Sequence, residues 1–254
     1  MIAKDPDLPY TVFQSGLNRI SNAFRLCKPL KSQDQVLHLL LWIRNSLSTL
    51  TTVNYPYPAS FEGDLPAWPV NVSCELITNA TDALHGLANG AILFYNGTHG
   101  SLKCADIYGE FMECSDATGC GSEGWDYQVC TEVTRPAGTN GVTDMFPVLP
   151  FTEQMREEYC LKKWNVVPKP TWLSVQMFGN DLSNTSSNIF FSNGAIDPWR
   201  GGGVLRNPNP DRYKTLLIPG AAHHLDLRGK NKDDSEAVKK AREQEVAAIS
   251  QWIH

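Results

Sequence analysis

The sequence has neither a stripe of one charge sign nor a long apolar run. Its 22 basic residues are scattered among 27 acidic ones in 254 residues, which gives no electrostatic case for binding nucleic acid. The longest apolar run, Val36 to Ile43, contains His38 and is far too short to span a bilayer. A hydrophobic content of 42% is sufficient for a buried core, so we expect a globular chain of one or two domains.

Three chemical motifs are also missing. The cysteines show no Cys-x-x-Cys zinc spacing, and Gly201-Gly202-Gly203 lacks the Lys-Ser/Thr pair of a phosphate loop. We therefore expect no metal and no cofactor, and we interpret the three glycines as a flexible turn. A Gly-x-Ser-x-Gly nucleophile motif is absent as well. The nearest approach, Gly121 to Gly124, has Cys120 where the first glycine belongs and no apolar strand before it, which indicates a surface loop.

The start of the chain has no apolar signal-peptide region, although its body resembles that of a secreted protein. Seven cysteines favour disulfides with one thiol left over, and four glycosylation sequons point to the secretory route. We therefore expect a C-terminal part of a longer protein, whose signal, nucleophile and one further cysteine lie before Met1. The sequons begin at Asn71, Asn79, Asn96 and Asn184.

Two short strand patterns near the C-terminus each deliver a polar side chain into a loop. The apolar run Ile189 to Phe191 leads to Asp197, and the run Lys214 to Ile218 leads to the pair His223-His224. An acid followed by a histidine, each after a strand, fits the order Ser, Asp, His of α/β-hydrolases. The pattern predicts that Asp197 meets a histidine at one sheet edge, and it leaves open which of the two.

Most of the remaining pattern is helical. We expect helices over 9–26, over 32–50 with Ser32 and Gln35 as a capping box, in pieces over 73–87 and 106–113, over 151–164, and at the C-terminus with Asp233 as N-cap. His38 lies on an apolar helix face and is interpreted as structural. Asp126, between two aromatic residues, is interpreted as a buried structural acid or as a carboxylate that recognises a cation. The segment 167–170 reads as a linker and divides the chain into domains 1–170 and 171–254.

Several segments together resemble a known family. The motif Phe-Ser-Asn-Gly-x-x-Asp-Pro-Trp-x-Gly-Gly-Gly at 191–203 and the motif Ala-His-His-Leu-Asp-Leu-Arg at 222–228 are similar to serine peptidases of the family comprising lysosomal Pro-X carboxypeptidase and dipeptidyl peptidase 7. The similarity continues at 55–58, 65–69, 125–128 and 143–147, and so covers nearly the whole chain. Within the family, Asp126 and the run 144–147 resemble the dipeptidyl peptidase.

The resemblance implies a role for individual residues. Asp197 and His223 correspond to the acid and base of the triad, and Trp199 resembles the aromatic lining of a proline-accepting pocket, although a tryptophan beside a sheet edge can also be plain packing. Asp126 resembles the carboxylate that receives a substrate's free amino terminus. The expected fold is the C-terminal part of an α/β-hydrolase sheet with a mainly helical, disulfide-bonded cap domain.

The resemblance also implies a disulfide pattern. Cys27 is expected to pair with Cys104 and Cys130 with Cys160, while the short spacing of Cys114 and Cys120 suits a local bridge. Cys74 is then the free thiol, since its family partner would lie before Met1.

Two functions compete. The first is a serine-type exopeptidase of the lysosome or secretory pathway. It acts on peptides with a free N-terminus and releases dipeptides that end in proline. Because this chain lacks the nucleophile, we expect it to be inactive alone. The second is a secreted, glycosylated, non-catalytic binding or regulatory module derived from the same family. The sequence leaves open whether the protein is a monomer or a homodimer.

Overall fold

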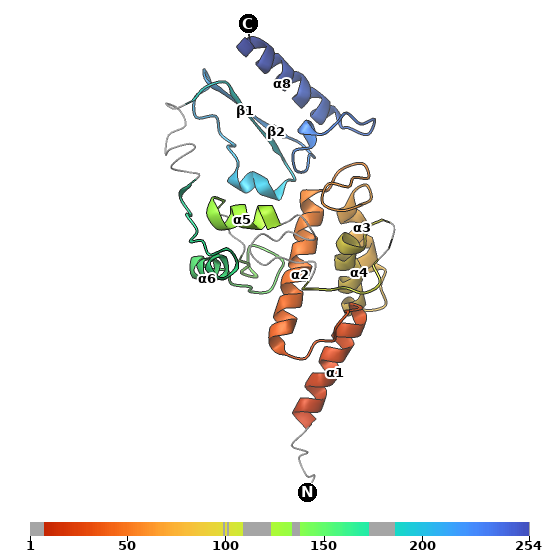
Figure 1. Ribbon diagram of the computed structural model, residues 1–254. Coiled ribbons are helices and arrows are strands. Elements are labelled where there is room, and N and C mark those ends of the chain that lie inside the picture. Colours follow the sequence, from red (N-terminus) through yellow and green to blue (C-terminus); the bar gives the residue numbers. More distant parts are fainter. Residues whose placement is uncertain are drawn as a thin grey trace.

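The chain folds into a helical part and a small α/β part. The structure is a computed structural model and describes residues 8–98, 100, 102–108, 123–133, 138–172 and 186–253. Figure 1 shows the helices α1, α2, α3 and α4 gathered toward the N-terminal end and the strands β1 and β2 with helix α8 toward the C-terminal end. Helices α5 and α6 lie to one side of α2, and α5 is the nearer of the two to the strands.

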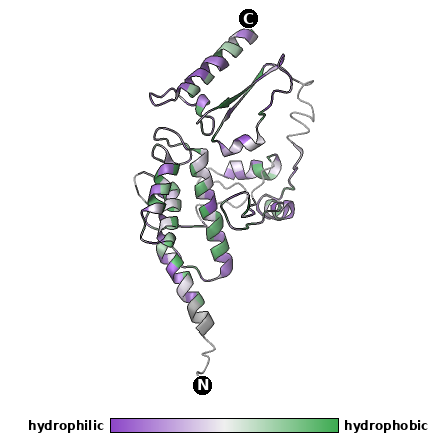
Figure 2. Cartoon of the chain, turned by 180° about the vertical axis from the view of Figure 1, so that it is seen from behind, coloured by the Kyte–Doolittle hydropathy of each residue, from purple (hydrophilic) through white to green (hydrophobic). Residues whose placement is uncertain are grey.

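The helical part is organised around Trp42. This residue lies on α2 (Gln33–Thr52), is fully buried, and stacks on Tyr95 of α4 (Ala83–Asn96) with ring centroids 3.9 Å apart. Helix α1 (Leu8–Ala23) contributes Leu17 and Ala23 to the same core, which also contains Phe24 from just after the helix. Apolar residues at helical spacing on these helices face one another and form the first hydrophobic core. Figure 2 shows the hydrophobic residues on α2 and α4 and along the two strands.

Helix α2 begins as the sequence predicts. Ser32 is its N-cap, and the Ser32 hydroxyl accepts a hydrogen bond from the backbone N–H of Gln35. The Gln35 side chain accepts from the backbone N–H of Lys31 rather than from that of Ser32. His38 is structural, as expected: its Nε2 lies 2.9 Å from the carbonyl oxygen of Ile107, and its ring stacks on Tyr108.

The helical pieces expected over 73–87 are two separate helices with different bounds. Helix α3 runs from Pro69 to Thr78, and α4 begins at Ala83. The break occurs because Asp82 caps α4, its Oδ1 accepting from the backbone N–H groups of Leu84 and His85. The expected helix over 106–113 is absent from its described part, 106–108, and the remainder lies outside the described residues.

Two disulfides tie the helical part together, with the pairings that the resemblance implies. Cys27 is bonded to Cys104 beside an isolated bridge between Leu26 and Ala105, and Cys130 of α5 (Glu123–Thr131) is bonded to Cys160 of α6 (Glu153–Trp164). Cys74 is exposed and unpaired. The remaining expected bridge, between Cys114 and Cys120, lies outside the described residues.

The described α/β part contains one two-stranded parallel sheet. Strand β1 (Ile189–Gly194) pairs with β2 (Tyr213–Ile218), in a register that places Ile189 beside Tyr213 and Gly194 beside Ile218. Both strands therefore end at the same edge, as the sequence predicts. Helix α8 (Glu236–Ile253) packs on this pair through the buried residues Val238, Ala241 and Ala248.

Helix α8 departs from the sequence prediction at its N-terminal end. Ser235, not Asp233, acts as its cap, because the Ser235 hydroxyl accepts from the backbone N–H of Val238. Toward the C-terminus Val246, Ile249 and Ile253 are exposed rather than packed. The described sheet has two strands, too few to cover the full apolar side of an 18-residue helix.

A second hydrophobic core joins the two parts of the chain. It combines Leu50, Tyr55 and Phe94 with Ile218 and Leu225 from the C-terminal segment. The expected boundary at 170 stays a prediction, and the two segments that it separates share this core. Among the described residues, no helix is long and apolar enough to cross a membrane.

Candidate active site

Asp197 lies three residues beyond the end of β1. It is the N-cap of the 3-10 helix η2 (Pro198–Gly202), and its Oδ1 accepts a hydrogen bond of 2.9 Å from the backbone N–H of Trp199. The residue is only 6% exposed. The expected flexible turn at Gly201 and Gly202 is therefore part of a short helix that Asp197 caps, which fixes the carboxylate relative to the backbone.

His223 is the histidine that meets this carboxylate. Its Nδ1 lies 2.8 Å from Asp197 Oδ2, so Nδ1 carries the proton of this hydrogen bond and Nε2 is left as an acceptor. His224 is placed differently: its backbone has a left-handed φ of 39°, and its ring packs edge-on against Phe61, with its centroid 4.3 Å from that of the His223 ring. The pKa of His224 is lowered, chiefly by burial and then by the neighbouring charge of His223. The structure thus resolves the choice that the sequence pattern left open.

The backbone of His223 is held by the end of α2. The N–H of His223 donates to the carbonyl of Thr52 at 3.0 Å, and its carbonyl accepts from the Tyr55 hydroxyl at 3.1 Å. Burial raises the pKa of Tyr55 to about 12, so the phenol keeps its donor proton over the whole physiological range. Sequence reasoning missed both partners, and the only signal for Tyr55 was its place in the family-like run 55–58.

Gly194 allows the two loops to meet. A Cβ at this position would lie 2.3 Å from the carbonyl oxygen of Ala221 and 2.6 Å from that of Ala222. The N–H of Ile196 donates to the Ala221 carbonyl, which joins the loop after β1 to the loop after β2. Only glycine permits this approach, and it brings Asp197 and His223 into register.

Trp199 lies next to the Asp–His pair. Its ring centroid is 5.8 Å from that of His223 and 5.9 Å from that of Trp125 on α5. Trp199 is partly exposed, at 36%. Two tryptophans beside an imidazole form an apolar wall suited to a flat or ring-shaped apolar side chain. Sequence reasoning considered Trp125 only as a neighbour of Asp126 and did not predict this contact.

Asp126 is fully buried on the same helix as Trp125. Its Oδ2 accepts hydrogen bonds from the Tyr159 hydroxyl at 2.9 Å and from the Trp164 Nε1–H at 2.7 Å. Its Oδ1 is enclosed and accepts from no described group. One oxygen of this carboxylate thus serves the contact between α5 and α6, while the other has no described donor.

A further carboxyl group lies near His223. Desolvation raises the pKa of Glu62, while interaction with the charge of His223 lowers it. This group belongs to the irregular segment between α2 and α3, and no motif in the sequence singled it out. The imidazole therefore has two acidic neighbours, one hydrogen bonded and one at longer range.

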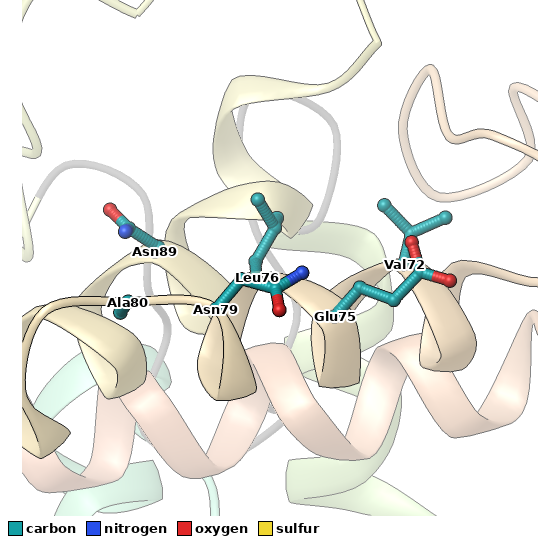
Figure 3. A pocket seen from close by; sticks show the side chains of 6 residues that line it. All are labelled: Val72, Glu75, Leu76, Asn79, Ala80 and Asn89. Atoms are coloured by element: carbon teal, nitrogen blue, oxygen red, sulfur yellow. The ribbon is translucent and has the colours of Figure 1, made fainter.

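Grooves occur away from the Asp–His pair. One groove of about 260 Å³ lies between α3 and α4, and Figure 3 shows the residues that line it, among them the sequon residue Asn79. Asn71 and Asn79 are exposed and Asn96 is partly buried, with its Oδ1 accepting from the backbone N–H of Leu102. Asn184 lies outside the described residues. Within the described part of the chain, no cluster of three or more acidic, histidine or cysteine side chains is arranged to hold a metal.

Comparison with known proteins agrees with this geometry. Residues 11–245 match the family described as serine carboxypeptidase S28. The chain is 39% identical over 243 residues to lysosomal Pro-X carboxypeptidase of Homo sapiens and 37% identical over 245 residues to that of Bos taurus, covering 94% of this chain and 47% of the relative in both cases. It is 34% identical to prolyl carboxy peptidase like protein 5 of Caenorhabditis elegans, over 88% of this chain and 46% of the relative.

These findings define the class and then the family. An aspartate hydrogen bonded to a histidine at the ends of two adjacent parallel strands has the geometry of the acid and base of serine-type hydrolases, and the matched family places the chain in the class of serine peptidases. The chain belongs to the serine carboxypeptidase S28 family. It spans about half the length of the curated relatives that it matches.

Proposed function

We propose that this chain carries the acid and base of a serine-type exopeptidase that releases N-terminal dipeptides with proline in second position. In this proposal residues 171–254 are the C-terminal part of an α/β-hydrolase sheet and residues 1–170 are its cap. The observation that carries it is the 2.8 Å contact between Asp197 Oδ2 and His223 Nδ1 beside the Trp199 wall.

The proposed chemistry follows from the tautomer that this contact sets. His223 Nε2 accepts the proton of a serine hydroxyl as that oxygen attacks the scissile carbonyl, and it returns the proton to the leaving amine. Asp197 stays ionised, holds the ring by its Nδ1–H, and stabilises the imidazolium that forms. The Trp199 N–H on Oδ1 keeps the carboxylate in place during this cycle.

Our proposal assigns no nucleophile among the described residues. The sequence has no Gly-x-Ser-x-Gly motif, and no hydroxyl of the described residues is hydrogen bonded to His223 Nε2. Loss of a triad serine reduces turnover by on the order of 10⁶. In our proposal this chain alone therefore does not hydrolyse peptides, and a fluorophosphonate probe does not label it.

Substrate recognition is assigned to two residues. Trp199, backed by Trp125, would pack against the proline ring, and Asp126 would pair with the substrate's free ammonium group. The enclosed Asp126 Oδ1 without a described donor supports the second assignment, because a buried ammonium needs such a partner. The contacts of Oδ2 with Tyr159 and Trp164 would keep the carboxylate oriented.

The setting of the proposed enzyme is the secretory pathway and the lysosome. Two disulfides in the structure support an oxidising compartment, and the matched human and bovine relatives carry the word lysosomal in their names. The sequons at Asn71, Asn79, Asn96 and Asn184 are proposed glycan sites on that route.

A carboxypeptidase is the second candidate, favoured by the names of the matched relatives. The two activities differ in which end of the peptide is anchored. A dipeptidyl peptidase requires a free amino group near its carboxylate anchor, whereas a carboxypeptidase requires a cation for the terminal carboxylate. A non-catalytic module is the third candidate, favoured by the lack of a described hydroxyl on His223 Nε2.

Titration calorimetry with product-like dipeptides tests the assignment. We expect alanyl-proline with a free amino group to bind and its N-acetyl form to bind at least about tenfold more weakly, because a buried carboxylate loses its ionic partner. Asp126→Asn should remove this difference, while Asp211→Asn, at an exposed carboxylate, should preserve it. Equal binding of both dipeptides would overturn the role of Asp126, and binding of neither would favour the non-catalytic module.

A further inference from the structure

The loop that carries His223 is clamped to α8 by one arginine. Arg242 Nε donates to the carbonyl of Asp226, its Nη2 donates to the carbonyls of Leu225 and Arg228, and its Nη1 bonds Asp234 Oδ2 at 2.6 Å. These bonds use four of the five N–H donors of the guanidinium. The loop from Pro219 to Arg228, here called the His223 loop, thus ends on α8.

Two carboxyl groups lie beside this clamp with few donors left for them. Asp226, in the short helix η3 (Leu225–Leu227), is 5% exposed, and Glu245 is one turn along α8 from Arg242. Asp226 Oδ2 and Glu245 Oε1 are both enclosed, and neither accepts a hydrogen bond from any described group. Asp226 nevertheless interacts with Glu245 and, in addition to burial, raises the pKa of that carboxyl group. Two enclosed carboxylates have no donor between them, so a close approach of the two requires a proton.

We propose that Asp226 and Glu245 share one proton and that this proton holds the His223 loop against α8 in acidic solution. When the proton leaves, two enclosed carboxylates face each other and repel. Asp226 is then pushed from α8, together with the loop that presents His223 three residues earlier. Glu245 is therefore a positioning residue: it acts through Asp226 on the loop that carries His223. This inference rests on the proposed function, in which His223 is the base.

The other charged groups near Asp226 and Glu245 have other partners, so the proton decides whether the two carboxyl groups attract or repel each other. Arg242 lowers the pKa of Glu245, but its guanidinium is bonded to Asp234. The Arg228 guanidinium lies over the rings of Tyr55 and Phe61. Of the strands that pack on α8, β1 has no titratable side chain, and β2 has Tyr213, bonded to Ser186, and Lys214, bonded to Gln251.

The pH range follows from the direction of the shift. Burial, and then the hydrogen bond and charge of Asp226, raise the pKa of Glu245 to about 7. A carboxyl group whose pKa is raised on folding stabilises the fold at low pH, and this contribution is lost as pH rises through the folded pKa. The lowered pKa of His224 acts in the opposite direction, since charging this ring as pH falls disfavours the fold. A variant at Glu245 separates the two effects.

Hydrogen exchange of the His223 amide between pH 5 and 8 tests the proposal. This N–H is bonded to Thr52, so its protection factor reports whether the loop is in place. In the unmodified chain we expect the protection factor to fall about tenfold or more as pH rises. In the Glu245→Gln variant, which mimics the neutral acid, the protection factor should change by less than about threefold over the same pH range. The same is expected of Asp226→Asn.

The matched control is Glu243→Gln, an exposed acid on the same helix, which should keep the pH dependence of the unmodified chain. A Glu245→Gln chain with unchanged pH dependence, or one that fails to fold at pH 5, would overturn the proposal. No step of the experiment measures hydrolysis. If hydrogen exchange contradicts the shared proton, the proposed roles of Asp197 and His223 are not affected. If the protein proves to be inactive, the proposal of a shared proton is not affected.

Discussion

The Asp–His pair depends on a residue that performs no chemistry. Gly194 ends β1 where the carbonyls of Ala221 and Ala222 pass, and the space beside its Cα is filled by those two oxygens. Asp197 follows three residues later, and His223 follows directly on Ala222. The relative position of Asp197 and His223 therefore depends on the absence of a side chain at Gly194.

The first prediction is that Gly194→Ala destabilises the fold by at least about 3 kcal/mol, because the added methyl group meets backbone atoms that cannot move aside like a side chain. Urea unfolding measures this change. Gly201→Ala is the matched control, since a Cβ added there would have nothing within 4 Å, and it should remain within about 0.5 kcal/mol. Equal stability of the two variants would show that the loops do not depend on this approach.

The residues of the pair could be predicted from sequence, but their support could not. A strand followed by an acid, and a strand followed by histidines, identified Asp197 and a histidine as neighbours because parallel strands end at one edge. The choice of His223 needed either the family motif or the geometry, in which His224 adopts a left-handed φ. Tyr55 and Thr52 support His223 from about 170 residues away, and no local pattern encodes so distant a contact.

At the scale of elements, α8 is connected to the site by hydrogen bonds as well as by apolar packing. Arg242 is largely buried and Asp234 is 1% exposed at its side chain, so the guanidinium neutralises an acid that has little access to water. The same arginine donates hydrogen bonds to three backbone carbonyls at the end of the His223 loop. The helix therefore fixes the loop as well as covering the sheet.

The second prediction is that Arg242→Met costs about 3–5 kcal/mol in the free energy of unfolding, because it leaves the buried Asp234 carboxylate without its cation and removes the guanidinium donors of three carbonyls. Thermal or urea unfolding provides the value. Lys239→Met removes an exposed pair with Glu236 on the same helix and should leave stability unchanged within error. If both variants lose the same amount, the clamp contributes nothing beyond an ordinary surface contact.

The third prediction compares the two disulfides of the helical part. The Cys27–Cys104 bond closes a separation of 77 residues and the Cys130–Cys160 bond one of 30. Each bond restricts the unfolded chain, more so for the longer loop. Replacing both cysteines of a pair by serine should therefore lower the free energy of unfolding by about 4.5 kcal/mol for the first bond and about 3.6 kcal/mol for the second. Unfolding of the two double variants measures the difference. A larger loss for the shorter loop would show that native packing at α5 and α6, rather than loop length, decides the effect.

Sequence pattern predicted the existence of elements better than their ends. The stripe on α2 and its Ser32 cap are as expected, since both are local. The capping of α4 by Asp82 and of α8 by Ser235 was missed, because several polar residues precede each helix and hydrogen-bond geometry selects among them. The exposed apolar end of α8 could not be foreseen either, since it depends on how many strands lie beneath the helix.

At the scale of the whole molecule, the helical and α/β parts act together. The second hydrophobic core contains residues from α2, from the irregular segment after it, from α4 and from the His223 loop. The hydrogen bonds that Thr52 and Tyr55 make with His223 run along this core. The position of the proposed base is therefore set by both sides of the predicted boundary at 170.

The central claim is that His223, held by Asp197, presents Nε2 to a peptide substrate. Labelling with alanyl-prolyl chloromethyl ketone tests it most directly and needs no serine. Nε2 attacks the methylene carbon, a carbon–nitrogen bond forms, chloride leaves, and the proton of the alkylated ring goes to solvent. Peptide mass mapping then locates the label. We predict that it lies on His223, that Asp197→Ala slows it, and that His38 and His85 react far more slowly. Labelling of His224 instead, or equal labelling of all the histidines, would contradict the account.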